Sequence, residues 1–327
     1  MASHRPLLLA LLVCAALPAS AQEVVIKLGT LAPQGSSWHA LLKEMGEKFS
    51  EASGGKVRLK IYAGGTQGTE ADMIRKMGVG MLQAASISNV GLHDIATEPM
   101  IFSAPGMMDE KTTSLVLPQV AKRMEAAIEA KGFVVLQWAQ VGSVRIFCKK
   151  PYHSAEEASD GKFFVWDGDP GSIEAYSLMG LRPVPLGSTD ILPSLETGMI
   201  TCVPQAPAYV LTTRLFERAG QMIDYPISFL IGATVVKKEA WEKIPPEVRP
   251  KLLAIAKEIG AKVDAEVKRL NDDAIEAMKK QGLKVVPADA ASWEKAAQRA
   301  WPAVRGKLIP ADFFDEFVKL RDAAKKQ

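Results

Sequence analysis

The chain has 327 residues and a formal charge of +3, from 40 Lys and Arg against 37 Asp and Glu. Basic and acidic residues are interspersed throughout, which gives no reason to expect a nucleic-acid partner or an anionic membrane surface. A chain of this length exceeds one comfortable hydrophobic core and therefore predicts two lobes.

The first residues predict a targeting segment. His4 and Arg5 precede the apolar run from Leu7 to Leu17, and Ala19-Ser20-Ala21 has the small residues of a cleavage site. The run is too short to span a bilayer, which needs about 20 residues. We therefore predict a signal peptide over residues 1–21, export to the periplasm and a mature chain that begins near Gln22.

Removal of that segment would leave Cys148 and Cys202 as the cysteines of the chain. An oxidising compartment permits a disulfide, but the sequence does not give the distance between the two residues. We expect two inert, dispensable thiols and keep pairing as the alternative. No Cys/His cluster has zinc spacing, so we expect neither a metal site nor a cofactor.

The first part of the chain alternates strands and helices. Ser36 can cap a helix that carries an apolar stripe from Trp38 to Phe49. Strands are predicted on either side of it, at Val24 to Leu28 and Val57 to Ile61, and Thr69 to Asp72 resembles a capping box for the next helix. This order predicts an α/β fold with a parallel sheet.

Later segments are unusually long. The apolar run Phe133 to Phe147 exceeds an average strand, and a return strand is expected at Ile231 to Val236. A helical face continues from Leu252 to Met278, well beyond the mean helix length. A short strand at Leu283 to Val286 and two closing helices should follow.

The tract between Gly161 and Gln205 carries a family resemblance. It contains, in order, Gly161-Lys162, Met179-Gly180, Pro183-Val-Pro185-Leu186 and Leu195-Glu-Thr-Gly198. This layout resembles the DctP-like solute-binding proteins of TRAP transporters. The resemblance implies a two-lobed periplasmic binding protein fold with crossing strands and a long bridging helix.

The same resemblance implies lobe boundaries. Lobe I would comprise residues 22–142 plus 231–270, and lobe II would comprise residues 143–230 plus 271–298. Residues 299–327 would form C-terminal helices that pack on the lobes.

The resemblance also identifies two positions that decide ligand chemistry. Arg145 lies sixteen residues before Gly161 and matches the first ligand-facing arginine of the family, with a gating ion pair near the hinge as its alternative role. Acid-binding members place a second, carboxylate-clamping arginine four residues after that glycine. Here the position is Val165, followed by Trp166. We therefore expect an apolar or amphipathic ligand, with a core position as the alternative for Trp166.

Three further residues of the second lobe are candidates. Ser188 matches a position where sugar-acid-binding members place an aromatic residue, and Gln205 matches one where relatives carry asparagine. Glutamine can donate and accept, which suits a hydroxyl, carbonyl or amide. Asp167 is a ligand candidate or, like Asp169, a turn former.

The first lobe offers Trp38, Ser88 and Asn89, and the crossing strand offers Trp138. Clefts open where such strands end, and ligands favour domain interfaces. For Trp38, a core position is an equal alternative.

The sequence favours a receptor over an enzyme. It has no Gly-x-Ser-x-Gly elbow, P-loop or Gly-x-Gly-x-x-Gly fingerprint. The resemblance implies a small-molecule solute as ligand and the small and large TRAP membrane subunits as partners, and we expect a monomer. The alternatives are a receptor for an organic acid held by Arg145 alone, a solute sensor for a membrane signalling protein, and a hydrolase on the same scaffold.

Overall fold

The computed structural model describes residues 23–167 and 170–326. The predicted signal peptide and Asp169 lie outside the described residues. The described strands form one continuous sheet in the order β2-β1-β3-β8-β4-β7-β5-β6, with β9 paired to β8. The strands are Val24–Thr30 (β1), Val57–Tyr62 (β2), Ala84–Ser88 (β3), Phe133–Cys148 (β4), Lys162–Trp166 (β5), Arg182–Leu186 (β6), Cys202–Gln205 (β7), Gln221–Lys237 (β8) and Lys284–Val286 (β9).

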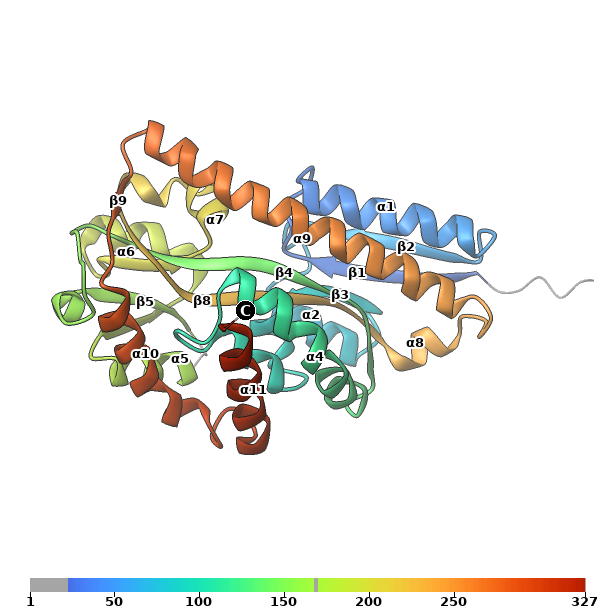
Figure 1. Ribbon diagram of the computed structural model, residues 1–327. Helices are drawn as coiled ribbons and strands as arrows, with labels where there is room; N and C mark the ends of the chain where they lie inside the picture. The colour runs from blue at the N-terminus through green and yellow to red at the C-terminus, as the bar shows by residue number, and fades with distance from the viewer. Residues whose placement is uncertain (1–22, 168–169, 327) are drawn as a thin grey trace, which may run out of the picture.

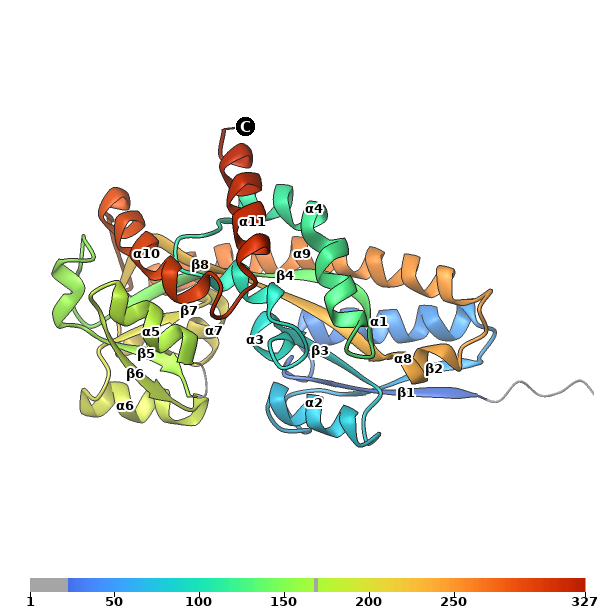
Figure 2. The same ribbon diagram turned by 90° about the horizontal axis from the view of Figure 1, so that it is seen from below.

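Helices cover both faces of the sheet (Figures 1 and 2). The α-helices are Ser37–Ala52 (α1), Glu70–Gly78 (α2), Asn89–Leu92 (α3), Glu110–Glu129 (α4), Pro170–Leu178 (α5), Ile191–Thr197 (α6), Pro207–Thr212 (α7), Lys238–Glu242 (α8), Arg249–Lys280 (α9), Ala290–Val304 (α10) and Ala311–Ala324 (α11). Short 3-10 helices lie at Glu98–Ser103 (η1), Glu157–Asp160 (η2), Ser188–Asp190 (η3) and Leu215–Glu217 (η4).

The N-terminal strands and helix caps confirm the sequence predictions. β1 pairs in parallel with both β2 and β3. The backbone amide of His39 donates to the Ser36 hydroxyl at 3.2 Å, which caps α1. Thr69 and Asp72 form a reciprocal capping box at the start of α2. Local hydrogen bonds that the sequence specifies therefore set where both helices begin.

Two long strands cross the whole molecule. β4 and β8 pair antiparallel from Phe133 opposite Lys237 to Cys148 opposite Gln221. The predicted long strand is confirmed in β4, but the return strand is much longer than Ile231 to Val236. Its pairing with β4 continues beyond Pro226, with register shifts that absorb the irregularity. The antiparallel pairs of β3, β4, β7 and β8 make the sheet mixed rather than wholly parallel.

The elements form two lobes joined by these strands and by α9 (Figure 1). The predicted long helix is confirmed and spans 32 residues. Its first half packs Leu252, Ile259 and Val263 against the core beneath β1, whereas Met278 packs in a separate core beneath β7. One continuous helix thus contacts both lobes.

The two predicted closing helices are α10 and α11. Trp293 of α10 packs in a core with Val165 and Tyr176, on the lobe that contains β5. Phe313 and Phe317 of α11 pack instead in the core built by η1 and α4. The C-terminal helices therefore contact different lobes.

The expectation of two free thiols is wrong. Cys148 and Cys202 form a disulfide that joins β4 to β7. The two residues stand directly opposite one another in the antiparallel pair, and both are fully buried. Because the sequence does not reveal which strands become neighbours, it could not supply this proximity.

Candidate ligand-binding site

The parallel strands of the two lobes end facing each other. β3 runs inward along β8 and ends with Ser88 opposite Gly232, which is in turn opposite Ala139 of β4. β7 runs inward from the other end and finishes with Gln205 opposite Arg145. The carboxyl ends of both sets of strands therefore approach the β4 segment from Ala139 to Arg145, about 20 Å of extended chain. Ligands bind at such edges in open α/β sheets.

Arg145 and Gln205 form the centre of the lobe II edge. Residues directly opposite in an antiparallel pair project to the same face, so their side chains are neighbours. Gln205 is buried, whereas 22% of the Arg145 side chain is exposed. The pair brings five guanidinium donors beside an amide that both donates and accepts.

The guanidinium of Arg145 is only partly engaged. Its Nη1 donates to Oδ1 of Asp224 at 3.3 Å. Burial lowers the pKa of the Arg145 side chain, and the charges of Asp224 and Asp272 oppose that shift. A half-buried arginine with donors to spare can hold one carboxylate or carbonyl oxygen.

A cavity of about 260 Å³ lies against this segment of β4. Arg145 lines it, as do the carboxylates of Glu110, Asp264 and Asp272 and the ammonium of Lys268. The other lining residues are polar or apolar and come from α4, β4, α7, β8 and α9: Ser114, Gln140, Gly142, Ser143, Pro207, Phe229, Ala265, Val267, Asn271 and Ile275. The lining thus combines apolar side chains with both signs of charge.

Val165 and Trp166 lie on opposite faces of β5, as alternation along a strand requires. Val165 is 4% exposed and belongs to the core that contains Phe163 and Tyr176. Trp166 is half-buried and packs edge-on to Phe164, with 5.0 Å between the ring centroids. The carboxyl end of β5 is therefore apolar on both faces.

Two other lobe II candidates follow strand ends. Asp167 is exposed, and its backbone amide donates to the carbonyl of Leu186 at 3.1 Å. Ser188 is the first residue of η3, and its side chain lies outside the described residues. Both follow inward-running strands, near the lobe II edge.

At the lobe I edge, Ser88 is held by the half-buried carboxylate of Glu70. Glu70 Oε2 accepts from the Ser88 hydroxyl at 2.7 Å and from the Gly91 amide at 2.9 Å, and Glu70 Oε1 accepts from the Ser88 amide at 2.8 Å. Burial raises the pKa of Glu70, against the lowering effect of these hydrogen bonds. The hydroxyl of Ser88 is therefore engaged within lobe I.

Asn89 and Trp38 each carry a buried polar atom without a hydrogen-bond partner among the described residues. These atoms are Oδ1 of Asn89 and Nε1 of Trp38. The Asn89 side chain is fully buried and its Nδ2 lies 3.8 Å from Sδ of Met100. Trp38 packs against the core of α1 and α9. Both residues therefore pack as core residues, yet each retains an unmet hydrogen bond.

Trp138 connects the crossing strand to α4. Its indole Nε1 donates to Oε1 of Glu125 at 3.0 Å, and the ring packs between two lobe I cores. The structure thus places Arg145, Gln205 and Trp166 on one face of the lobe II edge, with Val165 on the other face. Ser88 and Asn89 lie at the lobe I edge, while Trp38 and Trp138 pack within lobe I.

Sequence reasoning missed Asp224, Glu70 and Asn271. Asp224 is the partner of Arg145, and no local pattern marks it. Glu70 lies within the predicted capping box from Thr69 to Asp72, where an acidic residue is expected without any further role. Asn271 accepts from the Ala208 amide at 3.1 Å and lies beside Gly142, where φ is +114°. The unbroken helical stripe of α9 gave no sign of this contact.

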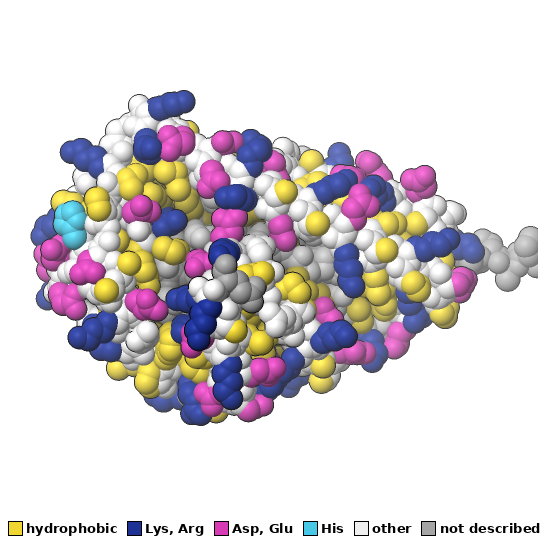
Figure 3. All heavy atoms as spheres, viewed as in Figure 1, with side chains coloured by type: hydrophobic (Ala, Val, Ile, Leu, Met, Phe, Trp, Pro, Cys, Tyr) yellow, Lys and Arg dark blue, Asp and Glu magenta, His cyan; other side chains and the backbone are white. Residues whose placement is uncertain are grey.

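Neither a membrane-crossing helix nor a cluster of metal ligands occurs in the described residues. No helix there is both long and apolar enough to span a bilayer. No group of three or more His, Cys, Asp or Glu within residues 23–167 and 170–326 could hold a metal ion. Figure 3 shows basic and acidic side chains mixed over one face of the molecule.

Two α/β lobes, a pair of crossing strands and inward-facing strand ends define the class of two-lobed solute-binding proteins. The chain belongs to the bacterial extracellular solute-binding protein family 7, DctP, whose profile matches residues 28–307. The predicted family and fold are confirmed. Members of this family are periplasmic receptors of TRAP transporters, which bind small molecules and work with membrane subunits, and they are not enzymes.

Individual relatives are distant. The chain is 22% identical over 301 residues to the C4-dicarboxylate-binding periplasmic protein DctP of Rhodobacter capsulatus, covering 88% of each chain. It is 24% identical over 209 residues to a solute-binding protein of Roseobacter denitrificans, covering 59% of this chain and 61% of that protein. Among solved structures, a TRAP periplasmic solute-binding protein from Pseudomonas putida F1 with bound D-glucuronate superposes with a TM-score of 0.81. Their sequences are 22% identical, over 93% of this chain and 97% of that one.

Proposed function

We propose that this protein binds a solute with an apolar or amphipathic body between its lobes and delivers it to the small and large membrane subunits of a TRAP transporter. The observation that best supports this proposal is that Arg145 lies directly opposite Gln205 at the lobe II edge. Arg145 or Gln205 would hold the single polar end of the solute. The apolar end of β5 would contact its body.

The charges around Arg145 support one polar end rather than two. Three carboxylates, those of Glu110, Asp264 and Asp272, line the cavity with Arg145 and Lys268. A dicarboxylate placed here would bring a second negative charge near this acidic group, which costs free energy in a partly buried site. The position of the second family arginine is Val165, which is buried in the lobe II core on the face of the sheet away from Arg145 and supplies no second donor.

The alternative function is a receptor for an organic acid held by Arg145 alone. The ligands named for two relatives, C4-dicarboxylate and D-glucuronate, are carboxylates and favour it. A lone arginine can bind one carboxylate in a bidentate geometry. The two candidates therefore differ in the body of the ligand rather than in its anchor.

Export, lobe limits and assembly are parts of the same proposal. The signal peptide over residues 1–21 would direct the chain to the periplasm, where the Cys148–Cys202 disulfide can form. The lobes would divide at residues 142 and 230 and within α9, near residue 270. The separate cores of β1 and β5 support this division. The receptor would act as a monomer.

Calorimetry with succinate, D-glucuronate and hexanoate tests the ligand chemistry. Hexanoate should bind the wild type and lose about 10- to 100-fold in affinity in Arg145→Ala, because a charge-assisted hydrogen bond is lost. Succinate and D-glucuronate should bind poorly. Micromolar binding of either one, unaffected by Gln205→Leu and weakened by Arg145→Ala, would favour the organic-acid alternative. Micromolar binding unaffected by both substitutions would contradict the proposed site.

A further inference from the structure

The disulfide lies on the same two strands as the Arg145 and Gln205 pair. Cys148 is three residues beyond Arg145 on β4, and Cys202 is three residues before Gln205 on β7. Both cysteines belong to the core that contains Val165. Because side chains alternate along a strand, Arg145 and Gln205 project to the opposite face. The disulfide therefore cannot touch a ligand held by that pair and can act on it only through the strands.

β7 is poorly equipped to hold its register without help. It has four residues, and one of them, Pro204, has no amide hydrogen to donate to the ladder. Within the described residues, β7 pairs with β5 at one position, Phe163 opposite Cys202. On the other strand, the pairing of β4 with β8 shifts between Val144 and Ile146, beside Arg145. A slip of one residue in β7 would turn Gln205 to the other face.

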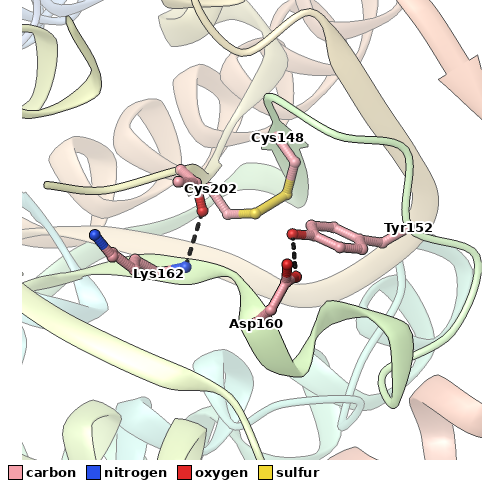
Figure 4. The surroundings of a disulfide bond; sticks show 6 residues. Cys148, Tyr152, Asp160, Lys162 and Cys202 are labelled. Atoms are coloured by element: carbon pink, nitrogen blue, oxygen red, sulfur yellow. Dashed lines mark hydrogen bonds between the residues drawn. A yellow bond between two sulfur atoms is a disulfide. The ribbon is translucent and has the colours of Figure 1, made fainter. Parts of the chain in front are cut away.

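Figure 4 shows the disulfide between Cys148 and Cys202 with Tyr152, Asp160 and Lys162 around it. A β-carbon added at Gly161 would lie 3.4 Å from Sγ of Cys202 and 2.9 Å from the ring of Phe163. The amide of Lys162 donates to the Thr201 hydroxyl at 2.9 Å, just before β7 begins. The disulfide between β4 and β7 therefore lies close to the point where β5 meets β7.

We propose that the Cys148–Cys202 disulfide is a positioning element of the ligand site, which holds β7 in the register that places Gln205 opposite Arg145. This inference rests on the proposed role of that pair in binding. It replaces the expectation that the two cysteines are dispensable.

The test compares the oxidised wild type with Cys148→Ala/Cys202→Ala, and with Cys148→Val/Cys202→Ala if the first variant fails to fold. Met45→Ala is the matched control, because it opens a cavity in the fully buried lobe I core, far from β7. The first readout is the Nε–Hε NMR signal of Arg145, assigned by its absence in Arg145→Lys. The second is amide hydrogen exchange of β7.

The signal of Arg145 should shift or broaden in the cysteine variant and stay unchanged in Met45→Ala. Exchange of the β7 amides should accelerate about tenfold, with β1 unaffected, because opening is local. An unchanged Arg145 signal and equal exchange in a folded cysteine variant would overturn the proposal. If neither cysteine variant folds, the same two readouts on wild type before and after reduction decide it.

These readouts need no ligand, so they separate this inference from the proposed function. Suppose that the Arg145 signal changes in the cysteine variant while hexanoate binds wild type and Arg145→Ala equally well. This result would refute the role of Arg145 in binding and leave the positioning role of the disulfide intact. An unchanged Arg145 signal in the cysteine variant, together with hexanoate binding that is weakened in Arg145→Ala, would refute the positioning role alone.

Discussion

The two edges that face each other across the crossing strands are held by different means. At the lobe I edge, the half-buried Glu70 carboxylate accepts hydrogen bonds from the Ser88 amide, the Ser88 hydroxyl and the Gly91 amide. At the lobe II edge, a covalent bond between Cys148 and Cys202 joins the two strands that carry Arg145 and Gln205. The first edge depends on noncovalent interactions within one lobe, and the second on a cross-link.

This difference assigns the edges different parts in recognition. The amide and hydroxyl of Ser88 both donate to Glu70, so Ser88 has no donor left for a ligand. Arg145 makes its hydrogen bond through one nitrogen to Asp224 and keeps its other donors. We therefore expect lobe II to determine which polar end is accepted. Each prediction below disturbs one edge or the connection between them.

Removal of the disulfide should have the largest effect. The cross-link spans a sequence separation of 54 residues. Its loss should lower the free energy of unfolding by about 4 kcal/mol, because the unfolded chain regains loop entropy. Denaturant titration of Cys148→Ala/Cys202→Ala against the oxidised wild type measures it. A difference below about 1 kcal/mol would show that the bond contributes little to stability.

Loss of the Glu70 carboxylate should rank second. Glu70→Ala leaves the partly buried donors on Ser88 and Gly91 without their acceptor and should cost about 3 kcal/mol. Chemical denaturation measures this cost, and Glu47→Ala, at an exposed position on α1, serves as the control. Equal stability of the two variants would argue against the Glu70 network.

The stability difference between wild type and Glu70→Ala should depend on pH. The folded pKa of Glu70 is raised above its ordinary value of 4.5, so the folded state holds the proton more tightly than the unfolded state. The stabilisation that comes from protonation of Glu70 is fully present below pH 4.5 and is lost as the pH rises through the raised pKa of the folded state. The stability advantage of wild type over Glu70→Ala should therefore shrink as the pH rises from about 4.5. An advantage that grows over this range would contradict the sign of the shift.

Ligand binding should stabilise the protein and draw the lobe I and lobe II edges together. A ligand present at 100 times its dissociation constant adds about 2.7 kcal/mol to the stability of the folded state. Hinge closure between the lobes should accompany this gain. Thermal unfolding and small-angle scattering with hexanoate measure the two effects. Stabilisation without a smaller radius of gyration would show that binding occurs without closure.

A substitution at the centre of β4 should have the smallest effect. Gly142 has φ of +114°, and an added β-carbon would lie 2.5 Å from Nδ2 of Asn271. Gly142→Ala should therefore cost about 2 kcal/mol in strain and displacement. Gly54→Ala, with φ of +61° and open space around it, is the matched control for the backbone term alone. Equal melting temperatures would show that Asn271 moves freely.

The fold was largely predictable because its periodic signals are local. The apolar stripes of α1 and α9 and the caps at Ser36 and Thr69 all depend on neighbours within a few residues. The full length of β8 was missed because Asp224, Tyr225 and Pro226 interrupt the apolar pattern, while the pairing to β4 comes from a distant segment. Tertiary pairing here overrides a weak local signal.

The site was predictable in part. The resemblance identified Arg145 and Gln205 separately, but only strand register places them opposite each other. The disulfide depends on that same register, as does the placement of Val165 on the face away from Arg145. Glu70 lies beside a capping motif, and its hydrogen bonds to Ser88 and Gly91 depend on the packing of α2 against β3 and α3. Such long-range proximity leaves no periodic trace in the sequence.

Mass spectrometry of small molecules released from freshly purified, denatured protein tests the central claim most directly. Wild type and Arg145→Ala, prepared in parallel from the same culture conditions, are compared. The account predicts that wild type releases a molecule with a largely apolar body and one polar end, which the variant retains poorly. Release of a small dicarboxylate or sugar acid in equal amounts from both proteins would contradict it.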